Sequence, residues 1–215
     1  NPLQVGALVK DPVKPLGATM TAAARYGFPG FLLSLATDQA SLSYWDYQFR
    51  LDGGTKANGW TVFAFGANDE LDTVAPNADP DKPNPPLAPS LVLQFHRLDL
   101  RYHQTAGKLE TTYRIVGGYD HTFSQGTDFT VWLAEPEIRS RYKLDDHFTL
   151  AAGLVGDARD LEQGGGANAS GGAFASLTKD LSTSQVGSAY VEALWRATRD
   201  WRIRPGIRGD VDHGN

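Results

Sequence analysis

The sequence predicts an all-β fold: a segment of an antiparallel transmembrane β-barrel of about ten strands, with short periplasmic turns and long extracellular loops. Apolar and polar residues alternate with a period of two along most of the chain. The connections between the alternating segments are short and long in turn. The polar faces carry closely spaced charges of both signs, as a wet barrel interior does. We therefore expect residues 1–215 to form one partial barrel domain.

The alternation is clearest between residues 43 and 52. One face of this segment carries Trp45, Tyr47, Phe49 and Leu51, and the other carries Asp46, Gln48, Arg50 and Asp52. The end of the chain repeats the pattern, with Trp201, Ile203, Pro205, Ile207 and Val211 opposite Arg202, Arg204, Arg208, Asp210 and Asp212. Each such segment is expected to place one face in an apolar environment and the other in water.

Ten strands are expected, at residues 3–9, 16–26, 42–52, 60–69, 91–104, 109–120, 128–142, 147–157, 186–195 and 201–212. At roughly 3.3 Å per residue, a tilted strand of about ten residues crosses a little under 25 Å. This is the height of the apolar band of an outer-membrane barrel. The strands therefore have the length that membrane crossing requires.

The connections predict the direction of the strands. Short connections are expected at 10–15, 53–59, 105–108, 143–146 and 196–200. Long ones are expected at 27–41, 70–90 and 158–185, with one of middling length at 121–127. If the short turns are periplasmic, the first strand runs inward from the cell surface and the last runs outward to it. The chain is then expected to lack at least one strand at each end.

Composition narrows the class of protein. The formal net charge is −5. The sequence has no cluster of basic residues of the kind that indicates nucleic-acid binding. Cysteine is absent, which excludes disulfides and thiolate metal sites. No run approaches the roughly 18 apolar residues of a membrane helix. An alternative of a different class is a soluble β-sandwich binding module, whose polar faces would be ordinary solvent surface.

Several stretches resemble the barrel strands of TonB-dependent outer-membrane receptors, most closely myxobacteria-like ones. They are Ala24–Leu35, Leu42–Asp52, Trp60–Leu71, Phe95–Tyr102 and Trp201–Arg208, and the resemblance extends over most of residues 16–212. It implies an outer-membrane location and uptake of a scarce, bulky nutrient such as a ferric siderophore, a vitamin or an oligosaccharide. The parent barrel would have about 22 strands around a plug. No part of this sequence matches the family's plug or TonB box.

The resemblance also implies partners. These are outer-membrane lipid and lipopolysaccharide, the plug domain and remaining strands, TonB through the region that lacks a match, and a small-molecule substrate. No cofactor is expected. A passive porin-like or structural barrel is the main alternative, and a plug domain upstream of Asn1 would distinguish the two.

The candidate site consists of charged residues expected to face the lumen. The substrate or lumen-facing candidates are Arg50, Arg97, Asp99, Arg101, Arg114, Arg202, Arg204 and Arg208. The same face is expected to hold Arg139, Arg141, Asp46, Glu110, Asp120 and Asp210. These residues could form ion pairs within the wall or with a plug. They could also line a conduit for an anionic substrate.

The sequence contains no motif that indicates catalysis or metal binding. The five histidines form no short metal-binding pair, and no serine lies in a Gly-x-Ser-x-Gly elbow. Asp120 and His121 are adjacent on a strand and should point to opposite faces, so they form no catalytic pair by themselves. We expect no enzyme activity and no metal site. The apolar segment at 28–35 is expected to be a short helix against the rim or in the barrel mouth.

Overall fold

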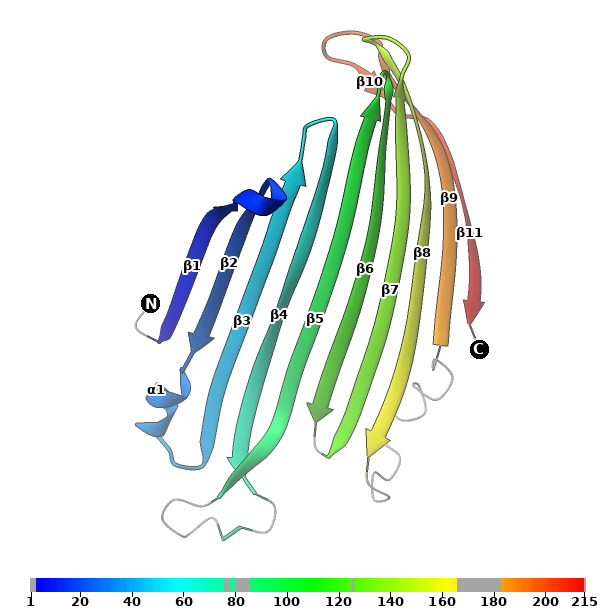
Figure 1. Ribbon diagram of the computed structural model, residues 1–215. Helices are drawn as coiled ribbons and strands as arrows, with labels where there is room; N and C mark the ends of the chain where they lie inside the picture. Colours follow the sequence, from blue (N-terminus) through cyan, green and yellow to red (C-terminus); the bar gives the residue numbers. More distant parts are fainter. Residues whose placement is uncertain (1–2, 76–77, 80–85, 125, 166–182, 215) are drawn as a thin grey trace.

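The computed structural model describes residues 3–75, 78–79, 86–124, 126–165 and 183–214. They form a single antiparallel sheet in which consecutive strands are neighbours (Figure 1). The strands are β1 (Gln4–Val13), β2 (Ala18–Gly27), β3 (Ala40–Gly54), β4 (Asn58–Val74), β5 (Leu87–Ala106), β6 (Leu109–Ser124), β7 (Thr127–Lys143), β8 (Phe148–Gly165), β9 (Thr183–Arg196), β10 (Arg202–Ile203) and β11 (Gly206–Gly214). Both β10 and β11 pair with β9.

Nine of the ten expected strands are each present as one strand, and the antiparallel all-β prediction is confirmed. The prediction of one continuous strand at 201–212 was wrong, because the ladder is interrupted at Pro205 between β10 and β11. Proline has no N–H to donate to the ladder, although the Pro205 carbonyl still accepts a hydrogen bond from Ala193 N at 2.9 Å. The expected strand boundaries were mostly too narrow.

Short turns lie at one end of the sheet and the longer connections mostly at the other (Figure 1). The short-turn end holds the connections at 14–17, 55–57, 107–108, 144–147 and 197–201. At the other end, which we call the long-loop end, the expected middling connection at 121–127 was wrong: β6 and β7 are joined by residues 125–126 alone. Much of the expected loops at 70–90 and 158–185 lies outside the described residues. Their flanks belong to strands β4, β5, β8 and β9.

The expected short helix is confirmed as α1 (Gly30–Ser34), at the long-loop end beside the start of β3. Gly30 packs closely there, since an added Cβ would lie 2.7 Å from the Leu42 carbonyl oxygen. Phe31, Leu32 and Leu35 remain exposed. Backbone packing therefore fixes the helix, while its apolar side chains point away from the sheet.

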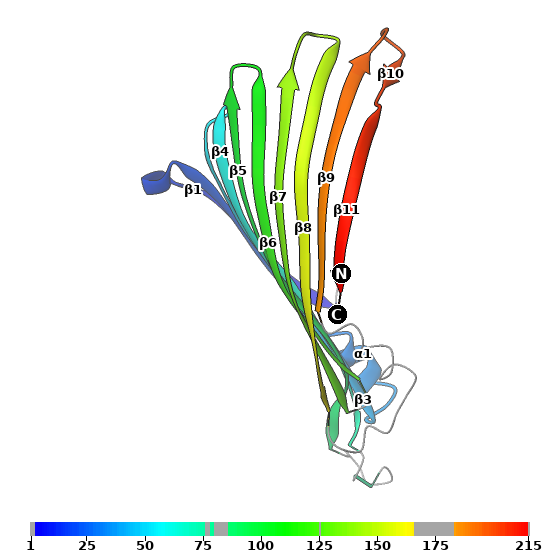
Figure 2. The ribbon, with the colours of Figure 1, turned by 90° about the vertical axis from the view of Figure 1, so that its right-hand side faces the viewer.

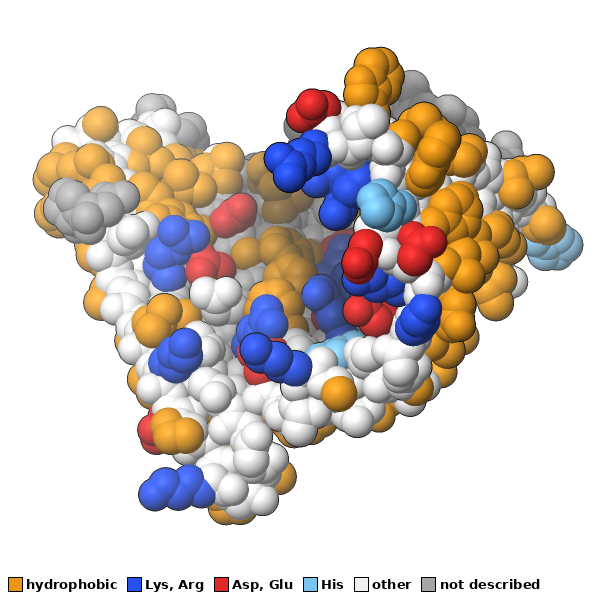
Figure 3. Space-filling model, turned by 90° about the horizontal axis from the view of Figure 1, so that it is seen from above, with side chains coloured by type: hydrophobic (Ala, Val, Ile, Leu, Met, Phe, Trp, Pro, Cys, Tyr) orange, Lys and Arg blue, Asp and Glu red, His pale blue; other side chains and the backbone are white. Residues whose placement is uncertain are grey.

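The cross-strand register divides the side chains between two faces. Figure 2 shows the sheet as a single twisted layer, and Figure 3 shows that it is hollowed, with charged side chains in the hollow. We call the hollowed side the concave face. It carries Arg50 on β3 and, along the register, Arg101, Arg114, Glu137 and Arg208. The opposite, convex face carries Trp45, Phe49, Ile203 and Ile207. The expected division of apolar and charged side chains between two faces is confirmed.

The sheet has almost no conventional core. Among the described residues only Ala18, Val116 and Ala151 are buried hydrophobic residues. Most large apolar side chains on the convex face are exposed, for example Leu154 at 58% and Ile207 at 78%. No helix within the described part of the chain is both long and apolar enough to cross a membrane. The convex face is therefore an extended apolar surface that no described residue covers.

The turn between β5 and β6 depends on glycine. Gly107 has φ +62°, and an added Cβ would meet no atom within 4 Å, so any cost of a side chain there arises from the backbone. We expect Gly107→Ala to lower the free energy of unfolding by about 1 kcal/mol, measured by urea titration. Gly117→Ala is the control, because Gly117 faces equally open space without a positive φ. A loss at Gly117 equal to that at Gly107 would contradict the backbone explanation.

Candidate functional site: the charged concave face

All eight predicted site residues lie on the concave face: Arg50, Arg97, Asp99, Arg101, Arg114, Arg202, Arg204 and Arg208. The register explains this placement, because residues directly opposite in neighbouring strands share a face. Arg101, for example, lies opposite Arg114. Four of these arginines lie in separate ion pairs, whereas Asp99, Arg101 and Arg114 form one group.

The most buried of these ion pairs is centred on Asp99. Its side chain is only 3% exposed and accepts hydrogen bonds from Arg101 at 2.5 Å and from Arg114 at 2.9 Å. Arg101 and Arg114 are direct cross-strand neighbours, an arrangement in which like charges destabilise a sheet. Asp99 offsets that repulsion by binding both guanidinium groups.

Other arginines pair in the same way along the sheet. Arg97 binds both carboxylate oxygens of Asp120 at 2.8 Å. Arg50 donates to Asp52 at 2.6 and 2.8 Å, and Arg208 donates to Asp210 at 2.8 Å. These side chains are partly exposed, so each pair is worth little by itself, about 0–1 kcal/mol. Ion pairs among the charged residues of this face, one of the two arrangements expected from the sequence, are present for these residues.

Two features of the concave face were not expected from the sequence. Glu192 on β9 accepts hydrogen bonds from Arg204 at 2.7 and 2.5 Å. Alternation along β9 places Glu192 on the polar face, so its position could have been predicted from the sequence. The second is an apolar cluster on the concave face, in which the rings of Phe63 and Phe65 stack at 4.8 Å and Phe95 meets Phe65 at 6.1 Å. Alternation of charges alone does not reveal this cluster.

The convex face carries the tryptophans that lie in strands and several tyrosines. All four tryptophans that lie in strands are on it, namely Trp45, Trp60, Trp132 and Trp195. Toward the long-loop end, Trp45, Tyr47, His96, Tyr119 and Trp132 form a chain of ring contacts with centroids 4.8–6.2 Å apart. Toward the short-turn end, the rings of Tyr102 and Tyr113 stack at 6.3 Å. Tyr44, by contrast, lies on the concave face, where its hydroxyl donates to Gln4.

Asp120 and His121, the pair considered for catalysis, lie on opposite faces as expected. Asp120 binds Arg97 on the concave face, whereas His121 Nε2 lies 3.0 Å from Asp128 Oδ1 on the convex face. His96 is held among aromatic rings, with Nδ1 3.1 Å from the Tyr47 hydroxyl. Within the described ranges, no group of three or more His, Asp or Glu residues is placed to hold a metal ion.

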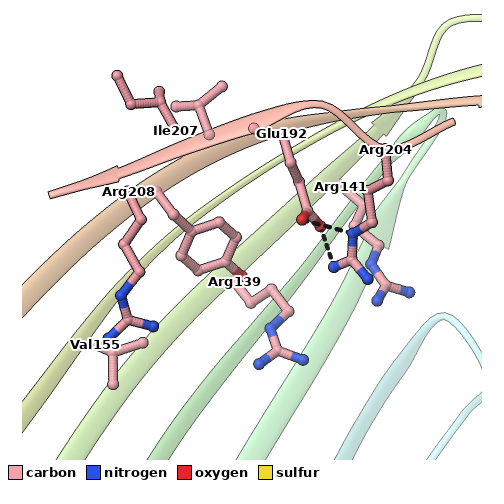
Figure 4. Close-up of a pocket in the computed structure, with 10 residues that line it drawn as sticks. Arg139, Arg141, Val155, Glu192, Arg204, Ile207 and Arg208 are labelled. Carbon is pink, nitrogen blue, oxygen red and sulfur yellow. Dashed lines mark hydrogen bonds and ion pairs between the residues drawn. The ribbon is translucent and has the colours of Figure 1, made fainter.

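Two cavities lie on the concave face toward the short-turn end. One, of about 390 Å³, is bordered by Arg139, Arg141, Glu192, Arg204 and Arg208 (Figure 4). The other, of about 370 Å³, is bordered by Arg101, Glu110, Arg114, Glu137, Arg139 and Arg141. Arg139 and Arg141 border both cavities, and we call the two neighbouring cavities together the arginine trough. Its lining can bind anions through several guanidinium groups.

Comparisons with protein-family models, curated proteins and solved structures find no match to this chain.

Proposed function

We propose that this chain forms part of the wall of an outer-membrane β-barrel that transports solutes. The observation that carries the proposal is the opposition of the two faces of one curved sheet. Leu98, Ile115 and Leu154 expose apolar surface on the convex side, whereas the concave side carries paired charges. A membrane supplies the apolar solvent that the convex face requires, and a hydrated lumen suits the concave face.

The curvature disfavours the soluble sandwich. In a sandwich, the apolar faces of two sheets pack against each other and the polar faces meet water. Here the apolar face is the convex one, and within the described residues the sheet is a single layer. Trp132 and Ile207 would have to be covered by a second layer wrapped around the outside. Lipid covers such a surface without that requirement.

The TonB-dependent form of the proposal is favoured by the sequence resemblance. In that form the barrel holds a plug, receives energy through TonB, and takes up a bulky nutrient such as a ferric siderophore, vitamin or oligosaccharide. Planar-bilayer conductance of the complete barrel distinguishes the alternatives. A plugged transporter conducts little until the plug is released, whereas a passive porin-like barrel conducts steadily.

Single cysteine substitutions at two adjacent positions test which face of the sheet contacts lipid. The chain has no native cysteine, so each introduced thiol is the only one present. Leu154 points to the convex face, and its neighbour Val155 points into the concave depression. In lipid vesicles we expect a charged maleimide reagent to modify Val155→Cys, since that thiol faces water. Leu154→Cys should remain unmodified until detergent replaces the lipid. Equal modification of the two thiols in vesicles would contradict the proposal.

A further inference from the structure

Between the β7 and β9 residues that border the arginine trough, strand β8 carries small residues on the concave face. Ala151 and Gly153 on β8 lie opposite Arg141 and Arg139 of β7, and opposite Glu192 and Tyr190 of β9. Ala151 is only 3% exposed, and Gly153 lies under the Tyr190 ring, where an added Cβ would be 2.4 Å from Cε1. With no long side chain on this part of β8, space remains between the side chains of β7 and those of β9 and β11.

Four guanidinium groups, from β7, β11 and the segment between β10 and β11, surround that space. Figure 4 shows Arg139, Arg141, Arg204 and Arg208 on the same side of the sheet, while Ile207 points to the other side. Glu192 is engaged by Arg204 and Glu137 by Arg139. Arg141 forms no hydrogen bond or ion pair through its side chain with any described residue. The trough therefore contains an exposed guanidinium whose donors are available.

The charges around the trough do not balance. Six arginines border the two cavities, against the three carboxylates Glu110, Glu137 and Glu192. Asp99 and Asp210 neutralise part of this excess from outside the lining. Glu110 lies opposite Arg141 in the register, yet the two form no ion pair within the described chain. Arg196 and Arg202 face each other on the next strands toward the short turns and add positive charge.

We propose that the arginine trough binds a small polyanion with at least two carboxylate or phosphate groups. A guanidinium presents a planar fork of donors that matches either group in a bidentate manner. Each cavity has the volume of a small-molecule pocket, about 300–1,000 Å³. That the ligand is a transported solute rests on the proposed function. The arginine trough adds the chemical class of that solute. Binding itself requires only the folded sheet.

The test is calorimetric titration of the full chain in detergent micelles at low salt, with citrate and pyrophosphate as separate probes. We expect both to bind, and the tighter of the two identifies carboxylate or phosphate as the preferred group. Arg141→Gln should weaken binding by about tenfold, as expected for the loss of one charge-assisted contact. Arg141 suits this substitution because no described carboxylate loses its partner. Glu110→Gln should strengthen binding about twofold to threefold by removing a competing charge.

Lys10→Gln is the matched control. Lys10 is an exposed cation on the concave face of β1, far along the sheet, and it has no ion pair with a described residue. An equal loss in the Arg141 and Lys10 variants would overturn the proposal, because it would show nonspecific attraction. Absence of binding by both probes would also overturn it. So would tighter, competing binding by a Glu-rich peptide of equal charge, which would identify a polypeptide segment as the occupant. None of these outcomes depends on the cysteine test in vesicles, so the two proposals fail separately.

Discussion

Replacement of Ala64 with arginine is expected to lower the free energy of unfolding in phospholipid bilayers by about 2–4 kcal/mol. Ala64 lies between Phe49 and Leu98 on the convex face, which we propose contacts lipid. A charge there must either remain in hydrocarbon or distort the bilayer to reach water, and both cost free energy. Urea unfolding of the reconstituted chain, followed by tryptophan fluorescence, measures the change.

Ala67→Arg provides the control on the same strand. Ala67 lies on the concave face between Asp46 and Phe95, so a new arginine there reaches water and a carboxylate. We expect its free energy of unfolding to remain within about 0.5 kcal/mol of the parent. If the two variants are equally stable, the convex face does not contact lipid at Ala64.

Asp99→Asn is expected to cost about 2–3 kcal/mol, the largest effect of any single change on the concave face. Asp99 is almost completely buried and binds two arginines that face each other across β5 and β6. The amide carries no charge, so the two guanidinium groups would repel each other at short range. The same urea titration measures this loss.

Asp52→Asn is the comparison for that result. Asp52 also binds an arginine of the same face, Arg50, but its side chain is 42% exposed. Water screens this pair, and we expect a loss below about 1 kcal/mol. A larger loss at Asp52 than at Asp99 would show that burial does not decide the strength of these pairs. High salt should reduce the Asp52 effect more than the Asp99 effect.

The sequence predicted the strands well because a period of two is a local property. Trp45 to Asp52 reads as a strand with two distinct faces, and β3 has those faces. Strand ends were less predictable. The segments 70–74 and 121–124 contain turn-compatible polar residues, yet both continue the ladder through pairing with neighbouring strands. Pairing energy from another strand is not visible in a local pattern.

The sequence predicted which charged residues share the concave face, but it did not predict the arginine trough. Alternation placed Arg139, Arg141 and Arg204 on one face. Their proximity over β8 depends on the register of four strands, which brings Ala151 opposite both Arg141 and Glu192. Asp99 illustrates the same limit, since its burial follows from the two arginines that the register places beside it. The separation of two residues along the sequence does not predict how close the register brings their side chains.

The most direct test of the membrane-wall account is the environment of Trp132. This residue is 53% exposed on the convex face, and phenylalanine can replace the other four tryptophans. In vesicles of brominated phospholipid, the account predicts strong quenching of Trp132 fluorescence by the bromine atoms and weak quenching by aqueous acrylamide. Strong quenching by acrylamide with no effect of the brominated lipid would contradict it, because the convex face would then lie in water.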